Sequence, residues 1–258
     1  MSTIAVLGLG EAGGAIAGDL VAAGAVVRGY DPAVSAPEGV LDTGSEADAA
    51  TGAELVLSVN SAKACVDALR AGVGGVDGAV WADLNTASPG TKRELAGIAT
   101  AHGITFADVA IMAPVPGNGL RTPMLASGAG AARVAELLGG LGASVEVLDG
   151  EPGMAASKKL LRSVFFKGLA AAVVEALEAG RAAGCEPWLR ENIVAELASA
   201  DESTVDRLVT GTHRHAVRRA DEMAAATDML TELGVRPSMA AATRDLLVRL
   251  TSSDRGLE

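Results

Sequence analysis

The sequence predicts an α/β protein: a doubly wound, mostly parallel sheet with helices on both faces, followed by an all-α domain. Two observations carry this prediction. Through residues 1–152, short apolar runs alternate with helical patterns, which is typical of βαβ units. From residue 153 onward the pattern is helical, and it begins with a long proline-free segment over residues 154–183. We therefore expect two domains, residues 1–152 and residues 153–258, joined by a long helix.

The expected strands are short apolar runs bounded by glycine, proline or polar residues. They cover residues 4–7, 25–27, 54–59, 79–84, 105–109, 124–128 and 144–148. In the first domain, helices are expected over residues 14–20, 62–71, 89–101 and 131–141. In the second, they are expected over residues 154–183, from Pro187 onward, over 202–233 and over 237–250, and we expect residues 251–258 to fray.

Charge and cysteine content exclude several classes of protein. The net charge of −11 disfavours binding to a nucleic-acid backbone. No apolar stretch is long enough to span a bilayer, and the N-terminus enters a strand at once, which leaves no room for a signal peptide. The two cysteines, Cys65 and Cys185, indicate neither a disulfide framework nor a clustered metal site. We expect a cytoplasmic protein that holds no metal.

A glycine-rich turn follows the first expected strand directly. It reads Gly8-Leu9-Gly10-Glu11-Ala12-Gly13, and it leads into a helix of small residues. In a dinucleotide-binding (Rossmann) unit, the first glycine permits a tight turn, the second lets a pyrophosphate approach the backbone, and the third lets the helix pack on the strand. The phosphates would lie at the helix N-terminus, where amides are unpaired. The alternative is a glycine-rich turn in an ordinary α/β unit.

Asp31, which ends the second expected strand, indicates which dinucleotide binds. A carboxylate there accepts hydrogen bonds from the ribose hydroxyls and repels a 2′-phosphate, which favours NAD over NADP. Arg28 precedes the acid and no arginine directly follows it, so a phosphate clamp is not evident. The alternative is that Asp31 only forms a turn before Pro32.

Polar residues also follow a later strand, in the segment Asp83-Leu84-Asn85-Thr86-Ala87-Ser88-Pro89. They lie at the carboxyl end of a strand, where ligands bind in open α/β sheets. Ser88 is also suited to cap the helix that Pro89 opens, and capping is its more general role. The residues expected to bind the cofactor are Gly8, Leu9, Gly10, Glu11, Ala12, Gly13, Asp31, Asn60, Asn85 and Thr86.

Lys159, near the start of the long helix, is the candidate acid and base. Hydride transfer to a carbonyl needs a proton donor, the reverse reaction needs a base, and a lysine with a lowered pKa serves as both. The like charges of Lys158 and Arg162, together with burial in a cleft between the domains, would lower the pKa of Lys159. Ser163 lies one turn further on and Lys167 about two. The alternative is a solvated pair of lysines.

Several segments together resemble the β-hydroxyacid dehydrogenases, and in particular a subgroup of 6-phosphogluconate-dehydrogenase-like proteins whose C-terminal domain is largely uncharacterised. The segments are Val6 to Gly13, Asp83 to Pro89, Asp108 to Pro114, Gly153 to Lys159 with Phe166-Lys167-Gly168, and His213 to Met223. The resemblance spans both domains. It implies NAD(P)-dependent oxidation of a small anionic hydroxyacid, or reduction of its carbonyl partner, with Lys159 as the catalytic lysine. It also implies a homodimer formed largely through the helical domain.

The chain departs from this family in its expected substrate pocket. Met112-Ala113-Pro114 stands where those enzymes usually have a Ser-Gly-Gly turn, Ser163 replaces an asparagine four residues after the lysine, and Glu222 replaces a C-terminal lysine. The usual substrates therefore do not carry over. We expect catalytic roles for Lys159 and Ser163. Substrate contacts are expected from Met112, Ala113, Lys167, Arg218 and Arg219.

A second cationic cluster surrounds Arg218 and Arg219. Either arginine suits bidentate binding of a carboxylate or phosphate, while the alternative is a solvated helix face with paired Arg and Glu residues. His213 and His215 lack an evident third metal ligand.

Two other functions stay open. The first is an imine reductase of the same architecture, against which Lys159 counts because the resemblance implies Asp or Tyr at that place in such enzymes. The second is a dinucleotide-binding sensor without turnover, against which a lysine in the cleft also counts.

Overall fold

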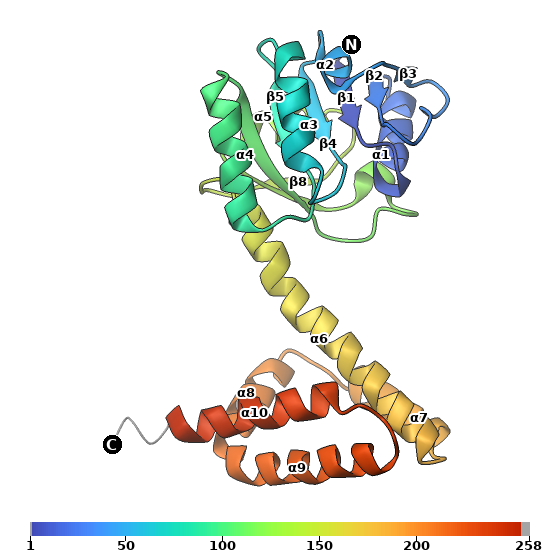
Figure 1. Cartoon of the computed structure of the whole chain (residues 1–258), viewed down its shortest axis with the longest axis vertical. Coiled ribbons are helices and arrows are strands. Elements are labelled where there is room, and N and C mark those ends of the chain that lie inside the picture. Colours follow the sequence, from blue (N-terminus) through green and yellow to red (C-terminus); the bar gives the residue numbers. More distant parts are fainter. Residues whose placement is uncertain (1, 254–258) are drawn as a thin grey trace. The chain divides into compact units, whose positions relative to one another are not determined.

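The computed structural model describes residues 2–253. The chain divides into two compact units between Arg162 and Ser163, inside one long helix, and each unit is described by itself (Figure 1). The division falls ten residues after the boundary expected from the sequence, because the first two turns of the long helix pack with the sheet. In the part of the chain that the structure describes, none of the helices has the length and apolar character needed to cross a bilayer.

The first unit contains the strands and the shorter helices between them. The strands are β1 (Thr3–Leu7), β2 (Val26–Tyr30), β3 (Leu41–Asp42), β4 (Leu55–Ser58), β5 (Val80–Asp83), β6 (Thr105–Ile111), β7 (Met124–Ser127) and β8 (Val145–Val147). The helices are α1 (Glu11–Ala22), α2 (Glu46–Ala50), α3 (Cys65–Gly72), α4 (Pro89–Ala101) and α5 (Ala131–Gly139), with 3₁₀ turns η1 (Val73–Gly75) and η2 (Gly119–Arg121). The remaining helices are α6 (Met154–Ala182), α7 (Glu186–Ala198), α8 (Thr204–Arg214), α9 (Ala216–Glu232) and α10 (Ser238–Ser253).

The strands form one sheet in the order β3-β2-β1-β4-β5-β6-β7-β8. All neighbouring pairs are parallel except β6 and β7, so the predicted doubly wound, mostly parallel sheet is confirmed. The chain order reverses direction between β1 and β4. In sheets of this kind, ligands bind at that switch point, beyond the carboxyl ends of the strands.

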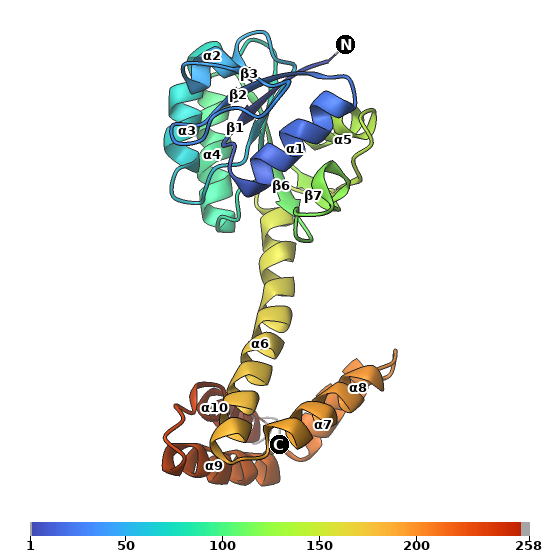
Figure 2. The ribbon, with the colours of Figure 1, turned by 90° about the vertical axis from the view of Figure 1, so that its right-hand side faces the viewer.

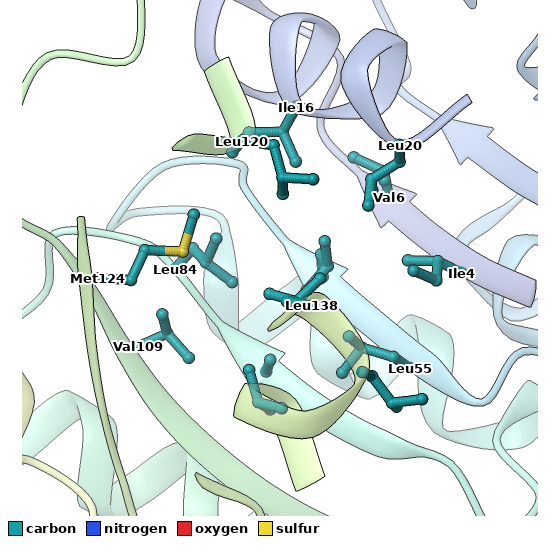
Figure 3. Packing of buried hydrophobic residues seen from close by; sticks show 14 of the residues in the cluster. Ile4, Val6, Ile16, Leu20, Leu55, Leu84, Val109, Leu120, Met124 and Leu138 are labelled. Atoms are coloured by element: carbon teal, nitrogen blue, oxygen red, sulfur yellow. The ribbon is translucent and has the colours of Figure 1, made fainter. Parts of the chain in front are cut away.

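Helices cover both faces of the sheet, α1 and α5 on one and α2, α3 and α4 on the other (Figure 2). Ile16 and Leu20 of α1 and Leu138 of α5 pack on Ile4 and Leu55 of the strands (Figure 3). The opposite face holds a second cluster around Trp81. Because apolar residues fill both layers, the strands are fixed in register and their ends form a stable platform for a site.

The second unit is helical and has a small core. Ala179 of α6, Leu230 of α9 and Ala240 of α10 form its buried cluster. The buried Glu175 carboxylate of α6 accepts hydrogen bonds from the amides of Met239 (2.7 Å) and Ala240 (2.8 Å). A carboxylate at these first-turn amides satisfies unpaired donors and complements the helix dipole, so Glu175 anchors α10 to α6.

Two sequence predictions about elements need correction, and two short elements were missed. The stretch 202–233 was expected as one helical segment, but His215 leaves helical geometry (φ −117°, ψ 20°) and separates α8 from α9. The sequence hides this break because the junction carries neither proline nor glycine. Residues 251–253 continue α10 rather than fraying, and residues 254–258 lie outside the described part. The short elements β3 and α2 were not predicted, since two to five residues give too little periodicity.

Gly13 of α1 offers a test of the glycine turn. A β-carbon at Gly13 would lie 1.8 Å from the carbonyl oxygen of Gly8, which no rotamer relieves. We expect Gly13→Ala to weaken NAD binding more than about tenfold, or to lower the melting temperature clearly, as calorimetry will show. The matched control is Gly18→Ala on the same helix, where a β-carbon meets nothing within 4 Å and a gain in stability is expected. Equal behaviour of the two variants would contradict this packing.

Candidate functional site

The turn between β1 and α1 has the geometry of a phosphate-binding loop. Gly8 adopts a positive φ of 94°, and a β-carbon there would lie 2.6 Å from the carbonyl oxygen of Val59. Gly10 caps α1 without a side-chain hydrogen bond, and a β-carbon on Gly10 would meet nothing within 4 Å. The first-turn amides of α1 are therefore open to an anion that approaches across Gly10. These residues fit the pyrophosphate of a dinucleotide.

Asp31 lies directly beside this loop, at the end of β2. Its Oδ2 accepts a hydrogen bond from the amide of Leu9 (2.8 Å), and its Oδ1 accepts from Ala33 (2.8 Å) and Val34 (3.0 Å). Arg28 is turned elsewhere, because its guanidinium pairs with Asp48 and donates to backbone carbonyls of α2. The end of β2 beside the glycine loop therefore carries the carboxylate of Asp31, while the guanidinium of Arg28 is bound to α2.

A cavity of about 360 Å³ lies at the carboxyl ends of β4, β5 and β6, next to α1. Its polar lining consists of Asn60, Ser61, Asn85, Thr86 and Lys159. Its apolar lining consists of Ala12, Val59, Ala62, Leu84, Ile111, Ala113 and Val115. All of these residues belong to the first unit. The cavity is at the switch point of the sheet, where the glycine loop and the strand ends meet.

Lys159 is placed in this cavity by α6. Its Nζ donates a hydrogen bond to Thr86 Oγ1 over 2.8 Å, which joins residues that are 73 positions apart in the chain. A hydroxyl that accepts from an ammonium keeps its own proton to donate onward. Lysine is the one cationic residue type among the side chains that line the cavity. The pair can therefore hold and move a proton at the cavity wall.

A row of four buried polar residues crosses the sheet behind the cavity. Ser58, Asp83, Asp108 and Ser127 are register partners on β4, β5, β6 and β7. Lys92 of α4, also fully buried, ion-pairs with Asp83 and lies 3.1 Å from Asp108 Oδ1. Buried charges persist only when they are paired in this way. The row is thus a connected network inside an otherwise apolar core.

Asn85 connects this row to the cavity. Its Nδ2 donates to Asp83 Oδ2 (2.6 Å) and to Ser58 Oγ (3.0 Å). Ser58 Oγ in turn donates to Asn60 Oδ1 (2.8 Å). Two amides of the cavity wall are therefore held by buried groups rather than by solvent, which fixes their orientation.

Asp108 connects the row to α6. Its Oδ2 accepts from the amides of Gly153 and Ala156, both at 3.0 Å. The amide of Ala155 donates to Ser127 Oγ (3.1 Å). These contacts satisfy amides at the start of α6 and hold its first turn against β6 and β7.

The pKa of the Cys65 thiol in α3 is affected by the same buried charges. Burial raises the pKa of the Cys65 thiol, Asp83 raises this pKa further, and Lys92 opposes that change. The thiol is therefore protonated at neutral pH and lacks the thiolate that a reactive cysteine needs. The described residues contain no group of three His, Cys, Asp or Glu side chains that could hold a metal ion.

The structure brings together some of the predicted site residues. Ala12, Asn60, Asn85, Thr86, Ala113 and Lys159 line one cavity, beside the loop of Gly8, Leu9, Gly10, Glu11 and Gly13. Met112 instead packs on the cluster of Ala110, Leu148 and Ala155 and is not among the lining residues. Ser163, Lys167, Arg218 and Arg219 belong to the second unit, and their roles stay predictions.

The sequence reasoning missed Lys92 and the use of Asp83 and Asp108. The sequence did contain a signal for the burial of Lys92. At helical spacing, Lys92 shares a face of α4 with Leu95 and Ala99, and this face is buried. A lysine at a core position of an amphipathic helix implies a buried partner. Ser61 and Val115 were also missed as lining residues, since loops after strands carry no periodic pattern.

Comparison with known proteins places the chain in a family. Residues 3–148 match the model of the NAD-binding domain of 6-phosphogluconate dehydrogenase. The chain is also 30% identical to 3-hydroxyisobutyrate dehydrogenase of Pseudomonas aeruginosa, in an alignment that covers 76% of this chain and 70% of that one. The chain belongs to the 6-phosphogluconate dehydrogenase-like family of NAD-binding hydroxyacid dehydrogenases. It is therefore an NAD(P)-dependent oxidoreductase. Residues 181–250 match a domain family of unknown function.

Solved structures agree with this placement. A conserved protein described as similar to 3-hydroxyacid dehydrogenases is 27% identical, with 98% of both chains covered and a TM-score of 0.63. An imine reductase of Streptomyces aurantiacus is 21% identical, with 100% of this chain and 96% of that chain covered and a TM-score of 0.80. The second likeness shows the fold alone. Other reductases of that fold are described in complex with NADPH and with NAD⁺.

Proposed function

We propose that this protein transfers a hydride between NAD and a small anionic hydroxyacid or its carbonyl partner, with Lys159 as general acid and base. The observation that carries the proposal is the Lys159 Nζ to Thr86 Oγ1 hydrogen bond of 2.8 Å, inside the cavity beside the glycine loop. A sensor without turnover has no need of an amine held at this place. The chemistry of family relatives supports the same reaction type.

The residues of the site are proposed to have different roles, according to where they lie. Bound NAD supplies the hydride acceptor, and the α1 amides with Asp31 hold the nucleotide end. During oxidation, the neutral amine of Lys159 takes the hydroxyl proton as the hydride leaves carbon, and the hydroxyl becomes a carbonyl. In the reverse direction the ammonium returns that proton. Thr86 orients the amine, and Asn60 and Asn85 offer fixed amides to the reacting groups.

The acid and base role of Lys159 has a direct test. We expect Lys159→Met to lower kcat by about 10²- to 10⁴-fold on the best substrate of a hydroxyacid panel, because the proton then has no positioned acceptor. The measurement is the absorbance of reduced cofactor across a pH series. Lys158→Met is the control, since it removes the same charge from an exposed neighbour; it should keep the maximal kcat and at most displace the pH profile, because only the like charge beside Lys159 is lost. An unchanged pH profile in Lys159→Met would remove Lys159 from the mechanism.

The same panel tests the function itself. It includes hydroxyacids with NAD and NADP, the matching carbonyl compounds with reduced cofactor, and cyclic imines. Turnover of imines alone would replace the proposal with an imine reductase. Tight NAD binding without turnover of any compound would favour a sensor.

NAD is the proposed cofactor because Asp31 follows β2 beside the glycine loop, where its carboxylate would face a ribose, while Arg28 is engaged with Asp48. We expect Asp31→Ser to lower the ratio of kcat/KM for NAD over NADP by about tenfold or more, since the repulsion of a 2′-phosphate is lost. Glu38→Gln is the control, an exposed acid of the same loop. A preference for NADP in the unaltered protein would overturn the assignment.

The substrate's anionic group needs a cation besides Lys159, and we propose Lys167, Arg218 or Arg219 for this role. Arg218 pairs with Glu222, and Arg219 donates to Thr212 Oγ1 over 2.8 Å. The ion pair of Arg218 is exposed, and exposed pairs contribute little, so a substrate carboxylate can compete for that guanidinium. Ser163 is a further proposed substrate contact. Ala113 lines the cavity, whereas Met112 packs on Ala110 and Ala155 and does not line it.

We also propose a homodimer formed through the helical unit. Neither α7 nor α8 contains a buried residue. Their large apolar side chains Trp188, Leu197 and Leu208 are each about half exposed or more. Large apolar side chains exposed together on neighbouring helices are typical of an interface between subunits.

The dimer is tested by sedimentation. We expect the full chain to sediment as a dimer at micromolar concentration and Leu197→Glu to shift it toward monomer, because a charge would enter the apolar contact. Ala200→Glu adds the same charge just beyond α7 and serves as control. A monomeric unaltered chain would contradict the proposal.

A further inference from the structure

We propose that Lys92 is a positioning residue that holds the two walls of the cavity together and thereby fixes the Lys159 amine beside Thr86. This inference rests on the proposed function of the same cavity. Lys92 is not among the residues that line the cavity. It acts through the two aspartates that it binds.

The Lys92 ammonium makes three contacts, all inside the core. It donates to the carbonyl oxygen of Asp83 over 2.7 Å and to the Oδ1 of the same residue over 2.5 Å. It lies 3.1 Å from Asp108 Oδ1. Lys92, Asp83 and Asp108 are all fully buried, so solvent does not loosen these contacts.

Each aspartate leads to a different wall of the cavity. Asp83 Oδ2 accepts from Asn85, the residue directly before Thr86. Asp108 Oδ2 accepts from the amides of Gly153 and Ala156, at the start of the helix that carries Lys159. The Lys159 to Thr86 hydrogen bond therefore closes a ring whose opposite corner is Lys92.

The charges explain why this corner needs a cation. Two carboxylates face one ammonium, which leaves a net charge of −1. Neutral donors offset this charge: the Asn85 amide on Asp83, and the amides of Gly153 and Ala156 on Asp108. The titratable groups that face Lys92 are Asp83 of β5, Asp108 of β6 and Cys65 of α3, among the residues that the structure describes. Without the ammonium, two buried carboxylates would repel each other and push β5 and the start of α6 apart.

This repulsion has a distinctive pH dependence. In Lys92→Met, one of the two carboxyls takes up a proton at a pH well above its ordinary range, because like charges in a buried site disfavour double ionisation. The protonated carboxyl can donate to the other and close the gap again. The loss caused by Lys92→Met is therefore largest at high pH and shrinks as the pH falls. A variant that merely loosens the fold has no reason to recover in acid.

The test compares three variants at pH values from 6 to 8.5. We expect Lys92→Met to lower kcat about tenfold or more at pH 8.5 and much less at pH 6, with the Kd for NADH changed less than about twofold. Arg93→Met is the matched control, because it removes a cation from the next, exposed position of α4. It should match the unaltered protein at every pH.

A double variant, Lys92→Met with Asp83→Asn, keeps the proposal testable if the single variant fails to fold. The asparagine removes one of the opposed charges and supplies an amide donor toward Asp108. We expect partial recovery of kcat at high pH and no further gain in acid. Thermal melting by circular dichroism reports stability for each variant.

A measurement without turnover separates this inference from the proposed function. Competitive acetylation of lysines, resolved by peptide mass spectrometry, gives the reactivity of Lys159 against pH, with exposed Lys158 as internal reference. We expect Lys92→Met, or the double variant, to shift this profile for Lys159 and leave Lys158 unchanged. If the unaltered protein turns over no hydroxyacid, the proposed function fails while this readout still decides the role of Lys92. Unaltered kcat and acetylation profiles, or a pH-independent loss that parallels weaker NADH binding, would overturn the proposal.

Discussion

The buried ion pairs of Lys92 with Asp83 and Asp108 are the constraint on which the rest of the site depends. The sheet alone brings strand ends together, but it does not hold the start of α6. Asp108 holds that start by accepting hydrogen bonds from the amides of Gly153 and Ala156. One cluster of charges therefore links the order of the strands to the place of Lys159. The chemistry of the cavity follows from the register of β5 and β6.

Much of the nucleotide site was accessible from sequence because its determinants are local. Gly8, Gly10 and Gly13 lie within six residues. Gly8 has a positive φ and Gly13 approaches the carbonyl oxygen of Gly8 closely, and one turn of chain is enough to express both requirements. Asp31 follows at a spacing that one βαβ unit fixes. The NAD(P)-binding domain and the fold class could be predicted from such short-range patterns, as could the long helix that carries Lys159.

The support behind the site was not accessible in this way. Lys92 stands among polar residues in a helix, and its burial depends on two aspartates that lie 9 residues before and 16 residues after it. Only strand pairing brings those carboxylates together. The same holds for Ser127. It lies opposite Asp108 because β7 pairs antiparallel with β6, and its hydroxyl accepts a hydrogen bond from the amide of Ala155 in α6. The position of Lys92 on the apolar face of α4 indicates a buried partner, but local propensity does not show that this partner is the polar row of the sheet.

The carboxylate of Asp31 illustrates a further coupling. It is bound by the backbone of Leu9 in the glycine loop and by the first residues of the loop after β2. The side chain that we propose to favour NAD thus also braces two neighbouring loops. Redesign toward the phosphorylated coenzyme therefore has to replace a structural tie as well as a charge, and an exchange at this one position trades selectivity against the rigidity of the turn that cradles the pyrophosphate.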